Sequence, residues 1–171
     1  CNVLIGSYSA LEDCTKVLQV FTWMRGAGLK PNYITLVNIQ GSFKSSNELR
    51  NYGLPLHAYT IHTGFIADDY VSNSLITMYA NCGDLDSSTK VFRTIIKKSV
   101  VSWNAMIAAN VQHGHGEEGL KLFMDMWHAG NNLDHVCLAE CLSSSASLAS
   151  LEEGMQLHGL GVKCGLDNDS H

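Results

Sequence analysis

A short motif occurs three times along this chain, each time at the same distance from a later phenylalanine. It reads Asn, any residue, Leu or Met, then Ile, and it occupies residues 2–5, 73–76 and 104–107. A phenylalanine follows each asparagine by 19 residues, at Phe21, Phe92 and Phe123. Self-similarity over such a distance is typical of a stacked array of repeats, in which neighbours together bury a core that none could bury alone.

A second set of matching positions measures the repeats. Gly53, Leu56, His57, Gly64 and Asp68 correspond to Gly154, Leu157, His158, Gly165 and Asp169. This set recurs at an offset of 101 residues, whereas residues 2 and 104 of the asparagine motif are 102 apart. One extra residue is therefore expected near positions 50–53, with Tyr52 as the candidate. The predicted repeats span 1–32, 33–68, 69–99, 100–134 and 135–169, and the first begins inside its own opening helix.

The composition suits a soluble helical array. Of the 171 residues 46% are hydrophobic, which is enough for a core. Pro31 lies at a predicted repeat boundary, where a helix should stop. Gly28, Gly64, Gly130 and Gly165 each precede a boundary by four residues, which is typical of a glycine that ends a helix. No apolar run approaches the roughly 20 residues that a membrane span needs. No targeting segment is visible, and we expect the chain to be a fragment.

Each repeat is predicted to contain two helices. Apolar residues recur at helical spacing over 103–112 and again over 117–127. The same pattern predicts helices at 72–81 and 85–95, and one at about 12–26 in the first repeat. Residues 35–39 and 137–141 have a strand-like composition, and only the repeat register predicts helices there. The predicted fold is all-α, an α-solenoid wound as a right-handed superhelix.

Three segments give this array a family resemblance: Trp103-Asn-Ala-Met-Ile107, Met78-Tyr-Ala-Asn-Cys-Gly-Asp-Leu85 and Leu151-Glu-Glu-Gly-Met-Gln-Leu-His158. With the alternating repeat lengths, they resemble pentatricopeptide repeats, specifically the plant PLS subclass, whose P, L and S motifs differ in length. The order would be a partial P, then L, S, P and L, over essentially the whole chain. Two departures are Cys1, which replaces an expected aromatic residue, and Gln40, which stands where an apolar residue is usual.

This resemblance implies binding of single-stranded RNA, with one base read per repeat by a few side chains. The family's selecting positions are the fifth and last of each motif, here Asn2, Asn32, Asn73, Ser99, Asn104 and Asp134 in the P and S repeats. The L repeats carry Val37, Asp68, Ala139 and Asp169 at these positions. An amide offers a donor and an acceptor to the Watson–Crick edge of a base. Val37 and Ala139 offer neither, so the L repeats should select poorly.

The second position of each motif would, by the same resemblance, clamp a base between neighbouring repeats. These positions hold Ile34, Tyr70, Val101 and Val136. Simpler roles stay open, because such side chains could equally pack between repeats. An early asparagine or a boundary aspartate could also be a plain helix N-cap. The recurrence of Asn at one register in three repeats favours base contact.

No other motif indicates chemistry. The six cysteines contain no C-x-x-C, and Cys137 and Cys141 lack the matching pair that a zinc site needs, so we interpret the cysteines as buried free thiols. His57 and His158 occupy equivalent positions, which favours a scaffold role over metal binding. Neither the deaminase signature nor a nucleophile motif is present. We therefore predict no catalytic residue, no metal and no cofactor.

The net charge of −5 is unusual for a protein that binds nucleic acid. Lys90, Arg93, Lys97 and Lys98 form one basic cluster, which is either a phosphate contact or, as we favour, a solvated surface. If RNA binds, base edges should matter more than phosphates, and the affinity should depend only weakly on salt.

The leading hypothesis is a sequence-selective RNA-binding module that acts, by family resemblance, in RNA processing or editing in a plant chloroplast or mitochondrion. Organellar processing or editing factors are the implied protein partners, and no membrane is expected. The alternative is a helical scaffold for protein–protein interactions. Asn2, Asn73 and Asn104 should point into one concave groove. The resemblance implies a preference for 5′-C-N-C-U-N-3′, where N is any base. The end repeats should expose apolar faces and cause self-association.

Overall fold

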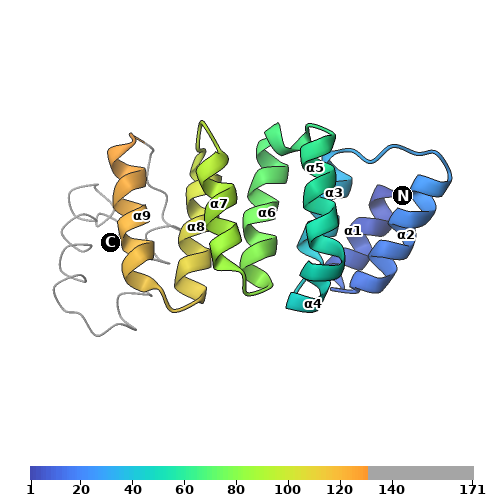
Figure 1. The fold of residues 1–171 in the computed structure, drawn as a ribbon, viewed down its shortest axis with the longest axis horizontal. Coiled ribbons are helices and arrows are strands. Elements are labelled where there is room, and N and C mark those ends of the chain that lie inside the picture. Colours follow the sequence, from blue (N-terminus) through green and yellow to red (C-terminus); the bar gives the residue numbers. More distant parts are fainter. Residues whose placement is uncertain (131–171) are drawn as a thin grey trace, which may run out of the picture. The chain divides into compact units, whose positions relative to one another are not determined.

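The computed structural model describes residues 1–130, which form helices joined by turns (Figure 1). The helices are α1 (Asn2–Ala10), α2 (Cys14–Gly26), α3 (Tyr33–Gly41), α4 (Ser46–Glu48), η1 (Leu49–Gly53), α5 (Leu54–His62), η2 (Phe65–Ala67), α6 (Asp69–Asn81), α7 (Leu85–Thr94), α8 (Val100–Gln112) and α9 (Gly116–His128). No strand occurs among these residues, so the all-α prediction is confirmed there, including residues 35–39. Residues 137–141 lie outside the described part.

The chain divides into two compact units, Cys1–Lys97 and Lys98–His171. In the first unit, α1 packs on α2 and α3, α3 packs also on α6, and α6 packs on α7. The helices α1, α3 and α6 therefore form a row in which each contacts the next. In the second unit, α8 packs on α9. Within residues 1–130, no helix is both long and apolar enough to span a bilayer.

The isoleucine of the repeated motif forms the centre of the core. Its three copies, at Ile5, Ile76 and Ile107, are completely buried. Phe92 and Phe123, which follow the asparagines at the fixed distance, are buried as well, whereas Phe21 is half-buried. The residues that recur in the sequence are therefore mostly the apolar residues that form the core.

Gln40 occupies the register position of these isoleucines in the second repeat, and it is also completely buried. The Ser74 hydroxyl on α6 donates to its Oε1. Its Nε2, however, has no hydrogen-bond partner among the described residues. A buried donor without a partner costs about 1–3 kcal/mol. The departure noted in the sequence is therefore a polar defect at the contact between α3 and α6.

Helical structure is continuous from Ser46 to His62, but its winding changes on the way. The short α4 runs into a π-helical turn at Leu49–Gly53, and α5 continues from Leu54. A π-turn closes hydrogen bonds from i to i+5, so it holds one residue more than an α-turn. The extra residue expected near positions 50–53 falls within this turn, and Tyr52 is part of it.

Glycine ends the helices before the predicted boundaries. Gly28, Gly64 and Gly130 have positive φ angles of 74°, 80° and 77°, as the sequence predicted for helix-terminating glycines. At Gly28, its own N–H donates to the Arg25 carbonyl and the Leu29 N–H donates to the Met24 carbonyl. These two bonds make a Schellman motif, which satisfies carbonyls that the end of α2 would otherwise leave unpaired. Gly165 lies outside the described residues.

Candidate nucleic-acid interface

The last residue of each predicted repeat is the N-cap of the following helix wherever the structure describes it. Asn32 caps α3, Asp68 caps α6 and Ser99 caps α8. The cap bonds from backbone N–H groups measure 3.0 Å at Asn32, 2.9 and 3.1 Å at Asp68, and 3.3 Å at Ser99. The capping role left open by the sequence is therefore present, and it holds each of these side chains at the start of a first helix.

Asn2 and Asn32, the predicted selecting pair of the first repeat, are in direct contact. Asn2 Nδ2 donates to Asn32 Oδ1 at 3.2 Å. The hydroxyl of Thr35, which is completely buried, lies 2.8 Å from Asn2 Oδ1. Asn2 is half-buried and Asn32 is exposed. Within the described residues, these bonds leave one N–H and one oxygen lone pair of the Asn2 amide for a ligand.

Asn73 is buried more deeply than expected. Only 9% of this residue is exposed, and its Oδ1 has no hydrogen-bond partner among residues 1–130. This burial differs from the prediction of an amide lying open in a groove, because Asn73 lies among the buried residues of α6, between Ser72 and Leu75. An unpartnered buried oxygen of this kind costs about 1–3 kcal/mol, and a donor from a ligand would remove that cost.

Asn104 lies on α8 in the second compact unit and is half-buried. Its predicted partner Asp134 lies outside the described residues, as do Val136, Ala139 and Asp169. Because Asn104 belongs to a different unit from Asn2 and Asn73, the convergence of the three amides on one groove stays a prediction.

The described L repeat presents little at its selecting positions. Val37 is half-buried on α3 and has no polar side-chain atom. At Asp68, Oδ1 accepts both cap bonds of α6. These placements are consistent with weak base selection by this repeat.

The predicted clamping residues are exposed. Ile34 is 42%, Tyr70 69% and Val101 62% exposed, and each lies in the first turn of a first helix. The ring of Tyr70 lies 5.9 Å from that of Tyr33, centroid to centroid, with their planes tilted by 32°. The starts of α3 and α6 therefore carry an exposed aromatic pair, a surface on which nucleic-acid bases stack.

Two residues near this surface were missed in the sequence. Tyr33 is 40% exposed beside Tyr70, and Thr35 contacts Asn2. The sequence does contain a signal for Thr35. Thr35 and Ser102 are both hydroxyl residues at the third position of a repeat, and in both cases the fifth residue of the preceding repeat is asparagine.

The basic cluster is not on the row of first helices. Lys90 and Arg93 are exposed on α7, the second helix of its hairpin, and Lys97 is exposed after the helix ends. This placement favours a solvated surface over phosphate contacts beside the asparagines.

His57 has a structural environment. Its Nδ1 lies 2.7 Å from the Tyr79 hydroxyl oxygen, and the two rings meet edge to face at 5.6 Å. Burial lowers the pKa of His57 and raises the pKa of Tyr79 to about 12, so both groups are uncharged near neutral pH. The pair joins α5 to α6, in agreement with a scaffold role. Among the described residues, no group of three His, Cys, Asp or Glu could hold a metal ion.

The described cysteines differ in exposure. Cys14 and Cys82 are buried free thiols, as interpreted from the sequence, and burial raises the pKa of each to about 11. Both are therefore protonated and poorly nucleophilic at neutral pH. Cys1 is exposed, which corrects that interpretation for the first residue, because no part of the described chain covers it.

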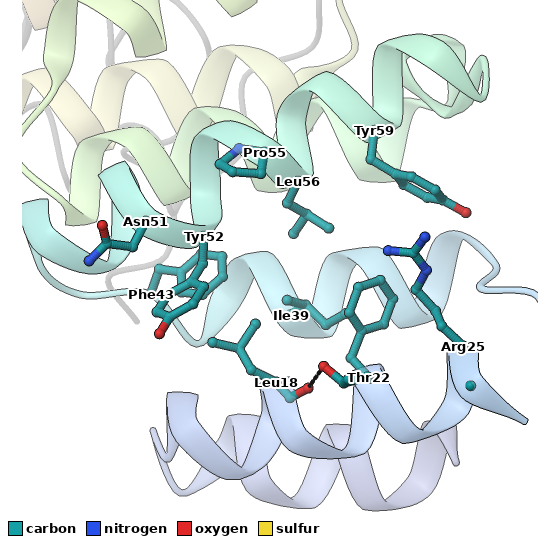
Figure 2. Close-up of a pocket in the computed structure, with 12 residues that line it drawn as sticks. Leu18, Thr22, Arg25, Ile39, Phe43, Asn51, Tyr52, Pro55, Leu56 and Tyr59 are labelled. Atoms are coloured by element: carbon teal, nitrogen blue, oxygen red, sulfur yellow. Dashed lines mark hydrogen bonds between the residues drawn. The ribbon is translucent and has the colours of Figure 1, made fainter.

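A pocket of about 560 Å³ lies in the first compact unit, between the second helices α2 and α5 (Figure 2). Ile39 and Phe43 line it between the two helices, and Tyr52 reaches it from the π-turn. The Arg25 guanidinium lies 5.7 Å from the ring centroid of Tyr59, a contact that crosses from α2 to α5. None of these residues contributes to the asparagine pair.

Comparisons with known proteins support the resemblance to pentatricopeptide repeats. The sequence profile of the PPR repeat matches residues 70–100 and 101–131. A chloroplastic pentatricopeptide repeat-containing protein of Arabidopsis thaliana is 32% identical over 168 residues, which are 98% of this chain and 21% of the relative. A mitochondrial one from the same plant is 32% identical over 154 residues, 90% of this chain and 24% of the relative. The chain belongs to the pentatricopeptide repeat family.

Solved structures support the same architecture for this pentatricopeptide repeat chain. The pentatricopeptide repeat protein PPR10, in complex with an 18-nt psaJ RNA element, matches 97% of this chain with 25% of its own, at a TM-score of 0.77 and 19% identity. Nuclear proteinaceous RNase P 2 of A. thaliana superposes on 93% of this chain, which corresponds to 37% of its own length. The TM-score is 0.63 and the sequence identity is 14%. At these identities the likeness establishes the fold, a helical repeat solenoid. The chain spans only 21% and 24% of the two curated relatives.

Proposed function

We propose that this pentatricopeptide repeat segment binds single-stranded RNA, one base per repeat, and that it selects bases through Asn2, Asn73 and Asn104. The observation that carries the proposal is the Asn2 amide, which Asn32 and Thr35 hold while one donor and one acceptor stay available. An amide held in one orientation presents a fixed donor–acceptor pattern. Discrimination between Watson–Crick edges requires such a pattern.

The surroundings of this amide support the proposal. Ile34 and Tyr70 are exposed at the starts of α3 and α6, where a base could be clamped. Stacking on an aromatic side chain contributes about 1–3 kcal/mol per base. The RNA complex of PPR10 adds support from a protein of the same fold.

The expected affinity is low. One net hydrogen bond contributes about 1 kcal/mol, so three selective repeats supply on the order of 3–5 kcal/mol of specific contact. A dissociation constant of 1 mM already requires about 4 kcal/mol. These hydrogen bonds alone therefore support binding only near the millimolar range, and base stacking or further repeats would be needed for tighter binding.

The test is an NMR titration of the chain with 5′-CACUA-3′ and with 5′-AAAGA-3′, which replaces the three selected bases by purines. We expect the first RNA to bind at least about tenfold more tightly, because two or more matched hydrogen bonds separate the two. Asn104→Thr should weaken the preference for uridine at the fourth base only, and Asn51→Thr, an exposed change on η1, should have no effect. Equal binding of the two RNAs would defeat the proposal.

We also propose that the parent protein acts in RNA processing or editing in the chloroplast or mitochondrion, with organellar processing factors as partners and without catalysis by this segment. Relatives named chloroplastic and mitochondrial support the compartment. A fluorescent fusion of the full-length protein in plant cells tests it, and a cytosolic signal would refute it.

One observation favours the alternative, a scaffold for protein–protein interactions. The pocket between α2 and α5 presents aromatic and aliphatic side chains, and none of the predicted base-selecting residues lines it. Failure of the chain to discriminate between the two RNAs would make the scaffold the preferred function.

A further inference from the structure

We infer that Thr35 is a positioning residue that sets the orientation of the Asn2 amide and thereby the base selectivity of the first repeat. This inference rests on the proposed RNA-binding function. Thr35 is completely buried at the start of α3, so it could influence a base only through the selecting residues it contacts, Asn2 and Asn32.

The hydrogen bonds around the Thr35 hydroxyl determine where its single proton goes. The oxygen accepts the Asn32 N–H at 3.2 Å and lies 2.8 Å from Asn2 Oδ1 and 2.9 Å from Asn32 Oδ1. Asn32 Oδ1 already accepts two bonds, from the Thr35 N–H at 3.0 Å and from Asn2 Nδ2 at 3.2 Å. Because a carbonyl oxygen has two lone pairs, the Thr35 proton is left for Asn2 Oδ1.

Asn2 is therefore held at both ends of its amide. Its nitrogen donates to an acceptor that the α3 cap fixes in place, and its oxygen accepts from the Thr35 hydroxyl. A rotation of the amide by 180° would set its oxygen against Asn32 Oδ1 and its N–H groups against a hydroxyl that already accepts one. The donor and the acceptor that remain for a base therefore keep fixed directions.

The sequence repeats this pairing. Where the fifth residue of a repeat is asparagine, the third residue of the next repeat is Thr, Ser or, once, Cys, and where the fifth residue is Val the third residue of the next repeat is Val. The pairs are Asn2 with Thr35, Val37 with Val71, Asn73 with Ser102, and Asn104 with Cys137. A side chain that served only as part of a capping box would not need to follow the identity of a residue in another repeat.

Ser102 has the same local environment on its own helix. It is 1% exposed, and its hydroxyl accepts the Ser99 N–H at 3.3 Å in a reciprocal capping box. Its hydroxyl is therefore buried beside a boundary residue, like that of Thr35.

The first experiment needs no RNA. Side-chain ¹⁵N relaxation of the Asn2 amide is measured in the whole chain with the variants Thr35→Val, Thr35→Ser and Ser45→Ala. Thr35→Val has nearly the same shape but no hydroxyl, and Thr35→Ser restores the hydroxyl. Ser45→Ala removes a capping box at α4 and serves as the matched control. We expect Asn2 to become mobile in Thr35→Val only, and equal Asn2 relaxation in the wild type and Thr35→Val would overturn the inference.

The second experiment compares 5′-CACUA-3′ with 5′-AACUA-3′, which differ only at the first base. We expect Thr35→Val to reduce the preference for the first RNA by about fivefold, the value of one net hydrogen bond, and Thr35→Ser to keep it. An equal loss in Ser45→Ala would show a general effect of helix stability and would refute the inference. If the wild type shows no preference, the proposed function fails, and the Asn2 relaxation alone decides whether Thr35 positions the amide.

Discussion

Asn2 and Asn32 are 30 positions apart in the chain, yet a hydrogen bond of 3.2 Å joins their side-chain amides. The oxygen of Asn32 that accepts this bond also caps α3. The predicted selecting pair of the first repeat is therefore part of the helix start of the second. A change at Asn32 acts on both the cap and the amide that would face RNA.

Asn32→Asp should change the base preferred by the first repeat from cytidine to uridine. A carboxylate still accepts from the Thr35 N–H and from Asn2, but it lacks the amide protons of Asn32. It therefore suits the N3–H donor of uridine better than the N3 acceptor of cytidine. We expect a shift in relative affinity of about fivefold, measured by NMR titration with RNAs that differ at the first base.

The cap itself should survive this change, because Asp is a good N-cap and its charge is favourable at a helix N-terminus. Asn51→Asp adds the same charge on η1 and serves as the control. A shift of equal size in both variants would mean that charge, rather than contact with the base, is responsible.

Gln40→Ile should stabilise the fold by about 1–2 kcal/mol, because it removes a buried donor without a partner. Ser74 keeps a partner, since its hydroxyl lies 2.9 Å from the Val71 carbonyl oxygen. Urea denaturation measures the change, and Gln19→Ile, at an exposed position of α2, is the control. A lower stability for Gln40→Ile would contradict this reasoning and would mean that the bond to Ser74 outweighs the unpaired Nε2.

The stability of the fold should fall as the pH drops below about 6.5. Burial lowers the pKa of His57 from that ordinary value in the folded chain, so the unfolded chain takes up the proton first. Protons therefore favour unfolding between 6.5 and the lowered folded pKa. Urea denaturation at a series of pH values should give a shallower slope for His57→Asn than for the wild type. An unchanged slope would exclude His57 as the source, and His62→Gln, at an exposed position, should keep the wild-type slope.

Self-association of the chain should depend on α1. Val3 and Leu4 on this helix are 82% and 51% exposed. The double change of Val3 and Leu4 to Lys should shift the species seen in sedimentation velocity toward the monomer. Ile96→Lys, at a fully exposed position after α7, is the matched control. A wild-type chain that stays monomeric over a wide concentration range would refute this prediction.

The sequence predicted the helices well but placed the starts of α6 and α8 three residues too late. Residues 103–112 were expected to be helical, whereas α8 begins at Val100, and the helix expected at 72–81 begins at Asp69. The reason is physical, because hydrophobic spacing reports only turns that are buried on one side. The first turns carry exposed residues such as Tyr70, and the N-caps Asp68 and Ser99 were the better signal for where these helices begin.

The sequence could predict which positions of the candidate site are equivalent, but it could not predict the contacts and burial of their side chains. Recurrence identified Asn2 and Asn73 as equivalent positions. It could not reveal that Asn2 contacts Asn32 or that Asn73 is almost covered, because both facts depend on how side chains pack between helices. Thr35 was missed because its contribution comes from a hydrogen bond across two repeats.

The π-turn at Leu49–Gly53 bears on how such arrays could be engineered. An added residue turns everything after it by about 100° around an α-helix, but a wider turn absorbs it locally. Here the widening lies in a second helix, so the additional residue need not alter the spacing between α1, α3 and α6. A designer of such an array therefore need not give every repeat the same length, but should keep the spacing between successive first helices constant. This spacing sets the distance between the positions at which successive bases of a bound strand would lie.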